Sequence, residues 1–147
     1  MKKITLILSV IFLVGCSGQS ENIDSQSIDK NETFNWRLVT SWPKNYPGLG
    51  MAPERIADLV EEMSDGQMKI TVYGAEEQVP AFGVFDAVSS GSHQMGHSGG
   101  YFWKGKVPAA QFFTSVPFGL TADEINAWVN RGGGLELWRE IYAPFNI

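Results

Sequence analysis

Apolar and polar residues alternate along three short stretches of the chain. Residues 34-FNWRLVTSW-42 and 68-MKITVY-73 follow this pattern, and 93-HQMGHS-98 is expected to be a third, short strand. A period of two places successive side chains on opposite faces of a strand. The pattern therefore predicts three β-strands.

Helical spacing separates the first two strands. Pro53 suits the first turn of a helix. Apolar residues then recur at i, i+3, i+4 and i+7, which predicts one apolar stripe facing a core. The stripe consists of Ile56, Leu59, Val60 and Met63. Gly66, after Ser64-Asp65, is the expected C-terminal cap.

A second, shorter amphipathic helix is expected over residues 81–90, with Phe82 and Phe85 on its apolar side. The order strand, helix, strand, helix, strand predicts an α/β fold, a βαβαβ parallel sheet with flanking helices and right-handed crossovers. The loops 43–50 and 99–106 then lie at the same edge of the sheet, where the strands have their carboxyl ends. Ligands of such sheets gather at that edge.

The second of these loops carries three adjacent aromatic residues, Tyr101, Phe102 and Trp103. In an extended backbone successive side chains face opposite ways, so the three rings would not all enter one core. Tyr101 is expected to meet Trp42 and Tyr46 over a shared crevice. A phenol offers a carboxylate both a hydrogen-bond donor and a flat apolar wall.

The remainder of the chain predicts an extended segment followed by two helical stretches. Residues 107–121 are apolar and punctuated by proline. Thr121 and Glu124 fit a capping box at a helix start. The glycine triplet 132–134 interrupts that helix, and residues 135–142 resume the helical spacing.

The beginning of the chain has the pattern of a secretory signal. Lys2-Lys3 precede the apolar run 4–14, which is too short to span a bilayer as a helix. The run ends in 13-LVGC-16, which resembles a bacterial lipobox, and this implies a signal peptide over residues 1–15 and diacylation of Cys16. Each buried methylene of such an anchor contributes about 0.8 kcal/mol. The alternative is an incidental cysteine in a signal peptide.

Residues 16–33 combine this cysteine with a polar stretch rich in Ser, Asn, Gln and Asp. Such a stretch buries too little apolar surface to fold and is expected to be a disordered tether. Cys16 is the single cysteine of the chain, so no internal disulfide is expected. Residues 34–147 remain as one domain or part of a larger one.

Composition and motifs exclude several classes of function. The net charge is −5 and no basic patch appears, which argues against nucleic acid as a partner. No phosphate-binding glycine motif follows a strand, and no serine stands in a G-x-S-x-G setting. Lys104 and Lys106 are either solvated or attract an anionic ligand.

Two histidines leave an enzymatic alternative open. His93 and His97 are four residues apart, and two histidines on one helical face bind zinc when a third ligand is near. The surrounding glycines argue against a helix there. A metal-dependent exported enzyme using this pair, and a structural lipoprotein without a ligand, are the rival interpretations.

Four long motifs stand in an order typical of one family. They are 36-WRLVTSWPKNYPG-48, 79-VPAFGVFDAVSSG-91, 95-MGHSGGYFWKGKVPAAQFFTSVPFG-119 and 132-GGGLELWREIYAPF-145. Together they resemble the amino-terminal half of the extracytoplasmic solute receptors of TRAP transporters, the DctP-type subunits. The most similar subgroup binds 2-oxo acids such as pyruvate and related monocarboxylates.

The resemblance implies that residues 34–147 are the amino-terminal, incomplete part of a two-lobed, periplasmic-binding-protein-like (type II) fold. The protein would be no enzyme. It would capture a small organic acid and deliver it to TRAP membrane subunits for uptake driven by an ion gradient. A periplasmic location, with a membrane anchor at Cys16, and a homodimer are further expectations.

The resemblance also implies which residues bind the ligand. Tyr101 matches a family position that lines the ligand pocket, and Phe102 and Trp42 are carried over with it. An arginine that holds the carboxylate, and the ligands of a sodium or calcium ion beside the acid, are expected beyond Ile147. No metal ligand is therefore expected within this chain. Gly99-Gly100 stand where the family pattern tends to carry larger small residues, which predicts a looser loop.

Overall fold

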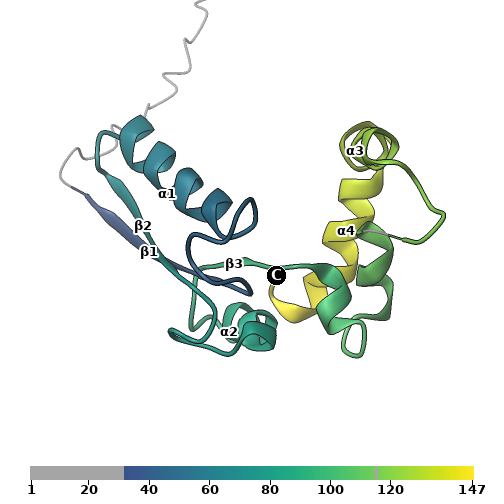
Figure 1. Cartoon of the computed structure of the whole chain (residues 1–147), viewed down its shortest axis with the longest axis horizontal. Helices are drawn as coiled ribbons and strands as arrows, with labels where there is room; N and C mark the ends of the chain where they lie inside the picture. Colours follow the sequence, from purple (N-terminus) through teal and green to yellow (C-terminus); the bar gives the residue numbers. More distant parts are fainter. Residues whose placement is uncertain (1–31, 115) are drawn as a thin grey trace, which may run out of the picture.

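A computed structural model describes residues 32–114 and 116–147, in which three parallel strands form one sheet (Figure 1). The strands are β1 (Phe34–Thr40), β2 (Met68–Tyr73) and β3 (Met95–His97), in the spatial order β2-β1-β3. Leu38 pairs with Val72 of β2 on one side and with Met95 of β3 on the other. The predicted βαβαβ sheet is confirmed.

The predictions for the start of the chain fall outside this description. The expected signal peptide (residues 1–15) and the lipidation at Cys16 lie outside the described residues, and so does the expected tether except for its last two residues. Within the described part of the chain, no helix has the length and apolarity needed to cross a membrane.

Helices cover both faces of β1, which explains why adjacent residues of this strand are buried. Leu38 packs on one face in a cluster with Ala57 of α1 (Met51–Met63). Val39 packs on the opposite face with Val84 of α2 (Val84–Ser89). A central parallel strand covered on both sides is buried along both of its faces.

The first helix is present, but the predicted stripe is partly wrong. Ile56 and Met63 are 48% and 77% exposed. Pro53 and Ala57 are the buried residues of α1, and Val60 packs against the same cluster. The small Pro53 and Ala57 let the helix lie close to the sheet, so the larger Ile56 and Met63 turn outward.

The second predicted helix consists of a 3-10 turn, η1 (Ala81–Gly83), that leads into α2. Phe85 is buried as expected, whereas Phe82 is 68% exposed and does not belong to the core. A Cβ added to Gly96 of β3 would lie 2.8 Å from Val84 Cγ1. The glycine thus permits close packing of α2 on β3.

Two short 3-10 helices follow β3, η2 (Gly100–Trp103) and η3 (Pro108–Phe113). The first lies within a predicted loop, and the second replaces part of the segment 107–121 that was expected to be extended. With three residues per turn, the successive side chains of η2 diverge by about 120°. Trp103 therefore packs on Phe85 in the core while Tyr101 is 45% exposed.

Two helices follow, α3 (Ala122–Arg131) and α4 (Gly134–Tyr142), with a final 3-10 turn, η4 (Ala143–Phe145). The predicted capping box is confirmed, because the Thr121 amide donates to Glu124 Oε2 (2.8 Å) and the Glu124 amide donates to Thr121 Oγ1. Gly133 has a φ of 84°, which permits the break between the helices. Both helices lie beyond β3, on the side away from α1 (Figure 1).

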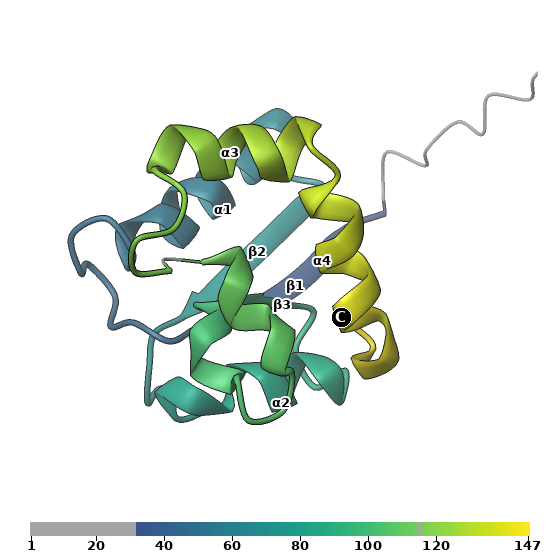
Figure 2. The same cartoon turned by 90° about the vertical axis from the view of Figure 1, so that its right-hand side faces the viewer.

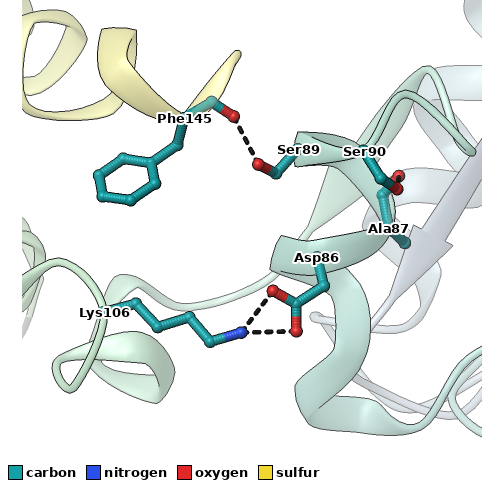
Figure 3. Close-up of polar contacts among 6 residues, drawn as sticks. All are labelled: Asp86, Ala87, Ser89, Ser90, Lys106 and Phe145. Atoms are coloured by element: carbon teal, nitrogen blue, oxygen red, sulfur yellow. Dashed lines mark hydrogen bonds and ion pairs between the residues drawn. The ribbon is translucent and has the colours of Figure 1, made fainter.

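Contacts around α2 tie these parts together (Figure 3). Lys106, which follows η2, forms an ion pair with Asp86 of α2. Ser89 Oγ donates to the carbonyl oxygen of Phe145 at 2.6 Å. Phe85, Val107 and Ala110 form a buried cluster below these contacts, so α2 packs against both the sheet and the later helices. Figure 2, turned by 90° from Figure 1, brings these later segments to the front.

Candidate functional site

The carboxyl ends of β1 and β3 lie side by side, as the sequence predicts. Thr40, the last residue of β1, is in register with His97, the last residue of β3. The Ser41 amide extends the ladder by donating to the His97 carbonyl oxygen at 3.0 Å. The loops that begin at Ser41 and Ser98 therefore leave the sheet at one edge.

Five aromatic side chains meet at this edge, and we call them the ring cluster. Its members are Trp42, Phe82, His97, Tyr101 and Phe102. The centroid of Trp42 lies 5.0 Å from His97 and 6.1 Å from Phe102. The Phe102 ring also lies 4.5 Å from Tyr101 and 5.1 Å from Phe82. Three separate loops thus contribute to one aromatic surface.

The three residues predicted for ligand binding, Tyr101, Phe102 and Trp42, are all members of the ring cluster. Tyr46, which was expected to join them, is 51% exposed and makes no ring contact within the described residues. Sequence reasoning missed Phe82, whose position after β2 places it in a third loop at the same edge. His97 was considered as a metal ligand or as a residue with structural hydrogen bonds, and its ring does lie 3.1 Å (Nδ1) from Thr40 Oγ1. Its place at the end of β3 was the signal that it belongs to this edge.

Tilted and edge-to-face geometry dominates the ring cluster. The Tyr101 and Phe102 rings meet at 62°, and Phe82 and Phe102 meet at 72°. Such arrangements bring positive ring edges onto negative ring faces. Tyr101 and Phe82 remain 45% and 68% exposed, so the cluster presents an apolar surface to its surroundings. This exposure does not fit the rival interpretation in which the rings belong wholly to a core.

Two glycines hold Tyr101 in place, and the prediction of a looser loop is wrong. Gly99 and Gly100 are both buried. A Cβ on Gly99 would lie 2.6 Å from Tyr101 Cε1, because the phenol ring folds back over this backbone. A Cβ on Gly100 would lie 2.8 Å from the carbonyl oxygen of Ala110. The missing side chains make close packing possible here.

Hydroxyl groups link the loops beneath the rings. Ser41 Oγ donates to the Ala81 carbonyl oxygen at 2.7 Å and lies 2.5 Å from Ser98 Oγ. Ser41 is only 7% exposed. Because Ser41 has one hydroxyl proton and uses it toward Ala81, Ser98 is the donor in the serine pair. The loops after β1, β2 and β3 are thereby joined at one point.

The two histidines lie on opposite faces of the sheet. His97 follows Met95, which packs on the α1 face, and strand alternation directs both to that face. His93 lies on the α2 face, where its amide donates to Ala87 and its ring meets Tyr73 edge-on at 6.5 Å. Within residues 32–114 and 116–147, no three His, Cys, Asp or Glu side chains group as metal ligands. The geometry offers no support for a shared metal at His93 and His97.

Both histidines are held in the neutral form. Burial lowers the pKa of His93, and the nearby Arg37 charge lowers it further. Burial also lowers the pKa of His97. Desolvation disfavours the imidazolium form of each ring.

The two lysines near η2, Lys104 and Lys106, lie in different surroundings. Lys106 pairs with Asp86, and its Nζ lies 5.4 Å from the centre of the Phe85 ring. Its charge is therefore directed toward α2. Lys104 is exposed, and the hydrogen bonds and ion pairs of the described residues do not involve it.

A large cavity lies away from the ring cluster. Its volume is about 460 Å³, and it runs between α2, β3 and α4. Its lining is mostly apolar and includes Val84, Met95, Trp103, Trp138 and Tyr142. The ring cluster remains the candidate ligand surface, because parallel sheets generally bind ligands outside the carboxyl ends of their strands. In addition, a surface that one lobe contributes to a binding site does not have to be a closed cavity.

A parallel sheet with an exposed aromatic surface at its carboxyl edge defines an α/β lobe of the small-molecule-binding kind. The family model named DctP, described as bacterial extracellular solute-binding protein, family 7, matches residues 38–146. The chain belongs to this family.

Individual relatives give more specific comparisons than the family model does. A monocarboxylate 2-oxoacid-binding periplasmic protein of Nostoc sp. strain PCC 7120 is 47% identical over 112 residues, which are 76% of this chain and 30% of that protein. A TRAP periplasmic solute-binding protein of Pseudoalteromonas atlantica T6c, solved with sodium and pyruvate, is 46% identical with a TM-score of 0.75. The match covers 78% of this chain and 35% of that one.

A third relative binds a different acid. A TRAP transporter solute-binding protein of Bordetella bronchiseptica RB50 was solved as a mixed-occupancy dimer with calcium and picolinate. It is 37% identical, with a TM-score of 0.76 over 80% of this chain and 35% of that one. The chain thus spans about a third of the length of the relatives that it matches.

Proposed function

We propose that this chain forms the amino-terminal lobe of an extracytoplasmic receptor for a 2-oxo acid such as pyruvate, or for a related monocarboxylate. The receptor binds its ligand without transforming it and delivers it to TRAP-type membrane subunits. The observation that carries the proposal is the ring cluster at the carboxyl edge of the sheet. Membership of a solute-binding family and the ligands named for the relatives support it.

The chemistry of the ring cluster suits a small, flat organic acid. The faces of Trp42 and Phe102 offer apolar walls to the carbon skeleton of the acid. The Tyr101 hydroxyl is a donor that a carboxylate or keto oxygen accepts. Since Lys106 is engaged by Asp86, we assign the contact with the acid on this lobe to the neutral Tyr101 donor rather than to Lys106. The arginine expected from the second lobe would neutralise its charge.

The ligands of an ion beside the acid are expected beyond Ile147. The relatives from Pseudoalteromonas and Bordetella hold sodium and calcium, respectively. Both ions prefer oxygen ligands, usually including carboxylates. The ring cluster contains no carboxylate, and the described residues hold no group of three His, Cys, Asp or Glu side chains. We therefore derive no step of binding through an ion on this lobe.

Location and assembly belong to the same proposal. The apolar run 4–14 and the lipobox at Cys16 support export and a lipid anchor that holds the receptor on the membrane. A homodimer is proposed in line with the dimer of the Bordetella relative. Sedimentation velocity and mass spectrometry of the purified protein test the dimer and the lipid, respectively.

The experiment on ligand binding uses an extended protein. In it, the full chain is followed by the part of the Pseudoalteromonas relative that lies beyond the matched region, because the chain spans about a third of that relative. Titration calorimetry with pyruvate should show saturable binding at one site per chain. The same titration with Tyr101→Ala should show affinity at least about tenfold weaker, since a hydrogen bond to a charged group and a ring contact are both lost.

Phe112→Ala is the matched control, because Phe112 is another exposed ring, 61% accessible, outside the ring cluster. Its affinity should stay within about threefold of the parent, which corresponds to less than about 0.7 kcal/mol. An extended protein that folds and shows no heat with pyruvate, lactate or other short 2-oxo and 2-hydroxy acids would disprove the proposal.

A further inference from the structure

We propose that His97 is a ligand-contacting residue whose Nε2–H donates a hydrogen bond to the carboxylate or keto oxygen of the bound acid. This inference rests on the proposed function and adds a specific polar contact to it. Three features of His97 support it: the tautomer of its ring, the openness of its Nε2 atom and the place of the ring within the cluster.

The tautomer follows from the hydrogen bonds of Thr40. Thr40 is 1% exposed, and its Oγ1 accepts a hydrogen bond from the Trp42 amide at 3.3 Å. The same oxygen lies 3.1 Å from His97 Nδ1. A buried hydroxyl proton needs an acceptor, and within the described residues Nδ1 is the acceptor available to it. Thr40 therefore donates to Nδ1, so the proton of the neutral imidazole resides on Nε2.

The Nε2 atom of His97 is open to its surroundings. Among the described residues, the buried polar side-chain atoms without a partner are His93 Nε2 and Trp138 Nε1. His97 Nε2 is not one of them, and no hydrogen bond within this part of the chain involves it. His97 thus carries a fixed N–H donor that is not used internally. His93, in contrast, has its free nitrogen enclosed.

The position of the ring directs this donor to the ligand surface. His97 lies 5.0 Å from Trp42, with the ring planes at 51°. Trp42 in turn contacts Phe102, which contacts Tyr101. An acid held against these rings has the Tyr101 hydroxyl on one side and His97 on the other. Two neutral donors can then satisfy separate oxygens of a 2-oxo acid, which has three.

Neutrality makes His97 a suitable donor. Burial lowers its pKa, so at neutral pH the ring is uncharged and its single proton is fixed by Thr40. A donor that is oriented before the ligand arrives loses little conformational entropy on binding. Loss of one hydrogen bond to a charged acceptor corresponds to about a tenfold to hundredfold loss of affinity.

The experiment compares two amides at this position in the extended protein. In His97→Gln the side-chain amide reaches about as far as Nε2, so the donor toward the ligand is kept and the contact with Thr40 is lost. In His97→Asn the amide lies about where Nδ1 does, so the contact with Thr40 is kept and the donor toward the ligand is lost. We expect pyruvate affinity within about threefold of the parent for His97→Gln and at least about tenfold weaker for His97→Asn.

Other outcomes overturn the inference. If His97→Asn keeps its affinity for pyruvate and His97→Gln loses it, His97 has a positioning role through Thr40. If both variants lose affinity equally, the ring has a packing role. No loss in either variant would show that the ring does not contact the ligand. If the parent protein does not bind pyruvate, both the proposed function and the inference fail. If the parent binds pyruvate but the variants do not behave as expected, only the inference about His97 fails.

A spectroscopic measurement does not depend on the variants folding. Long-range proton–nitrogen NMR spectra of the parent protein at neutral pH should show the Nε2-protonated tautomer for His97. On addition of pyruvate, the Nε2 resonance of His97 should shift while those of His93 stay in place. An Nδ1-protonated ring, or an Nε2 resonance that does not respond to a bound ligand, would overturn the inference.

Discussion

The hydroxyl oxygens of Ser41 and Ser98 lie 2.5 Å apart and connect the carboxyl ends of β1 and β3. The Ser41 hydroxyl donates a hydrogen bond to the carbonyl oxygen of Ala81, at the start of the 3-10 turn that carries Phe82. The hydroxyl pair therefore fixes the three loops from which the ring cluster arises. Its removal should disturb the ligand surface as well as the fold.

Ser41→Ala should destabilise the protein by about 1–3 kcal/mol, because it leaves the part-buried Ala81 carbonyl oxygen and Ser98 hydroxyl without their partner. Urea unfolding of the full chain measures the change in the free energy of unfolding. Ser90→Ala is the control, because Ser90 is exposed and its hydroxyl bonds only to the nearby Ala87 carbonyl oxygen. The free energy of unfolding of this control should stay within about 0.5 kcal/mol of the parent value. Equal effects of the two substitutions would refute the role of the pair.

The glycine pair predicts two different effects at adjacent positions. In Gly100→Ala the new Cβ meets the backbone oxygen of Ala110 at 2.8 Å, and backbone cannot move aside cheaply. We expect a loss of about 1–3 kcal/mol in the free energy of unfolding. Gly105→Ala, where nothing lies within 4 Å, is the control and should change stability by less than about 0.5 kcal/mol.

In Gly99→Ala the new Cβ meets the Tyr101 ring instead, at 2.6 Å from Cε1. This ring is a movable side chain, so the fold should accommodate the methyl group while Tyr101 swings away. We expect pyruvate affinity in the extended protein to fall at least about fivefold, with stability reduced less than in Gly100→Ala. A variant that keeps the parent affinity would show that the placement of Tyr101 does not matter for binding.

His93 should make stability depend on pH. Burial and the Arg37 charge lower its pKa below the ordinary value of about 6.5, so between the two pKa values the unfolded chain binds more protons than the folded one. The free energy of unfolding should therefore be highest above pH 6.5 and decline as the pH falls from there toward the folded pKa. The slope levels off below the folded pKa, where both states are protonated.

His93→Gln removes this contribution, and the difference between the parent and the variant in urea unfolding should be pH-dependent between pH 7.5 and 5. His97 also has a lowered pKa and contributes with the same sign, so some pH dependence should remain in the variant. Parallel pH profiles for the parent and His93→Gln would contradict the buried, neutral state of His93.

Lys106→Met should affect neither stability nor binding strongly. Lys106 and Asp86 have side chains that are 46% and 65% exposed, and ion pairs at such sites contribute less than about 1 kcal/mol. The methionine side chain keeps an apolar contact with the Phe85 ring. We expect pyruvate affinity within about threefold of the parent, measured by calorimetry at low and at high salt. Two results together would show that Lys106 attracts the acid. Lys106→Met would bind pyruvate at least about tenfold more weakly at low salt, and high salt would weaken binding by the parent to a similar extent.

The sequence predicted much of the architecture because its local signals agree with its packing. Alternation identified the strands, and the Thr121–Glu124 capping box marked the start of α3. The Gly133 region was recognised as a break because glycine alone adopts its positive φ at low cost. At these positions local conformational preference and tertiary structure demand the same backbone.

Predictions failed where the outcome depends on distant neighbours. The apolar stripe of α1 was misplaced, since the small Pro53 and Ala57 rather than Ile56 and Met63 face the sheet. The segment around Ala110 was expected to be extended, although its contacts with Phe85 stabilise a 3-10 helix. Periodicity in a sequence gives the spacing of apolar residues but not the direction from which another element approaches.

The sequence by itself determined the βαβαβ order and the edge at which the loops gather, because both follow from local periodicity and from the polarity of a parallel sheet. The same reasoning put Trp42 and Tyr101 at that edge, whereas Phe102 was added, and a ligand-pocket role assigned, through the resemblance to a family. Only the tertiary structure decided which other groups join them. It placed Phe82 and His97 beside Trp42, separated His93 onto the opposite face and turned Lys106 toward Asp86. These relationships depend on three loops meeting in space, and no pattern along one segment encodes the distance between residues of different loops.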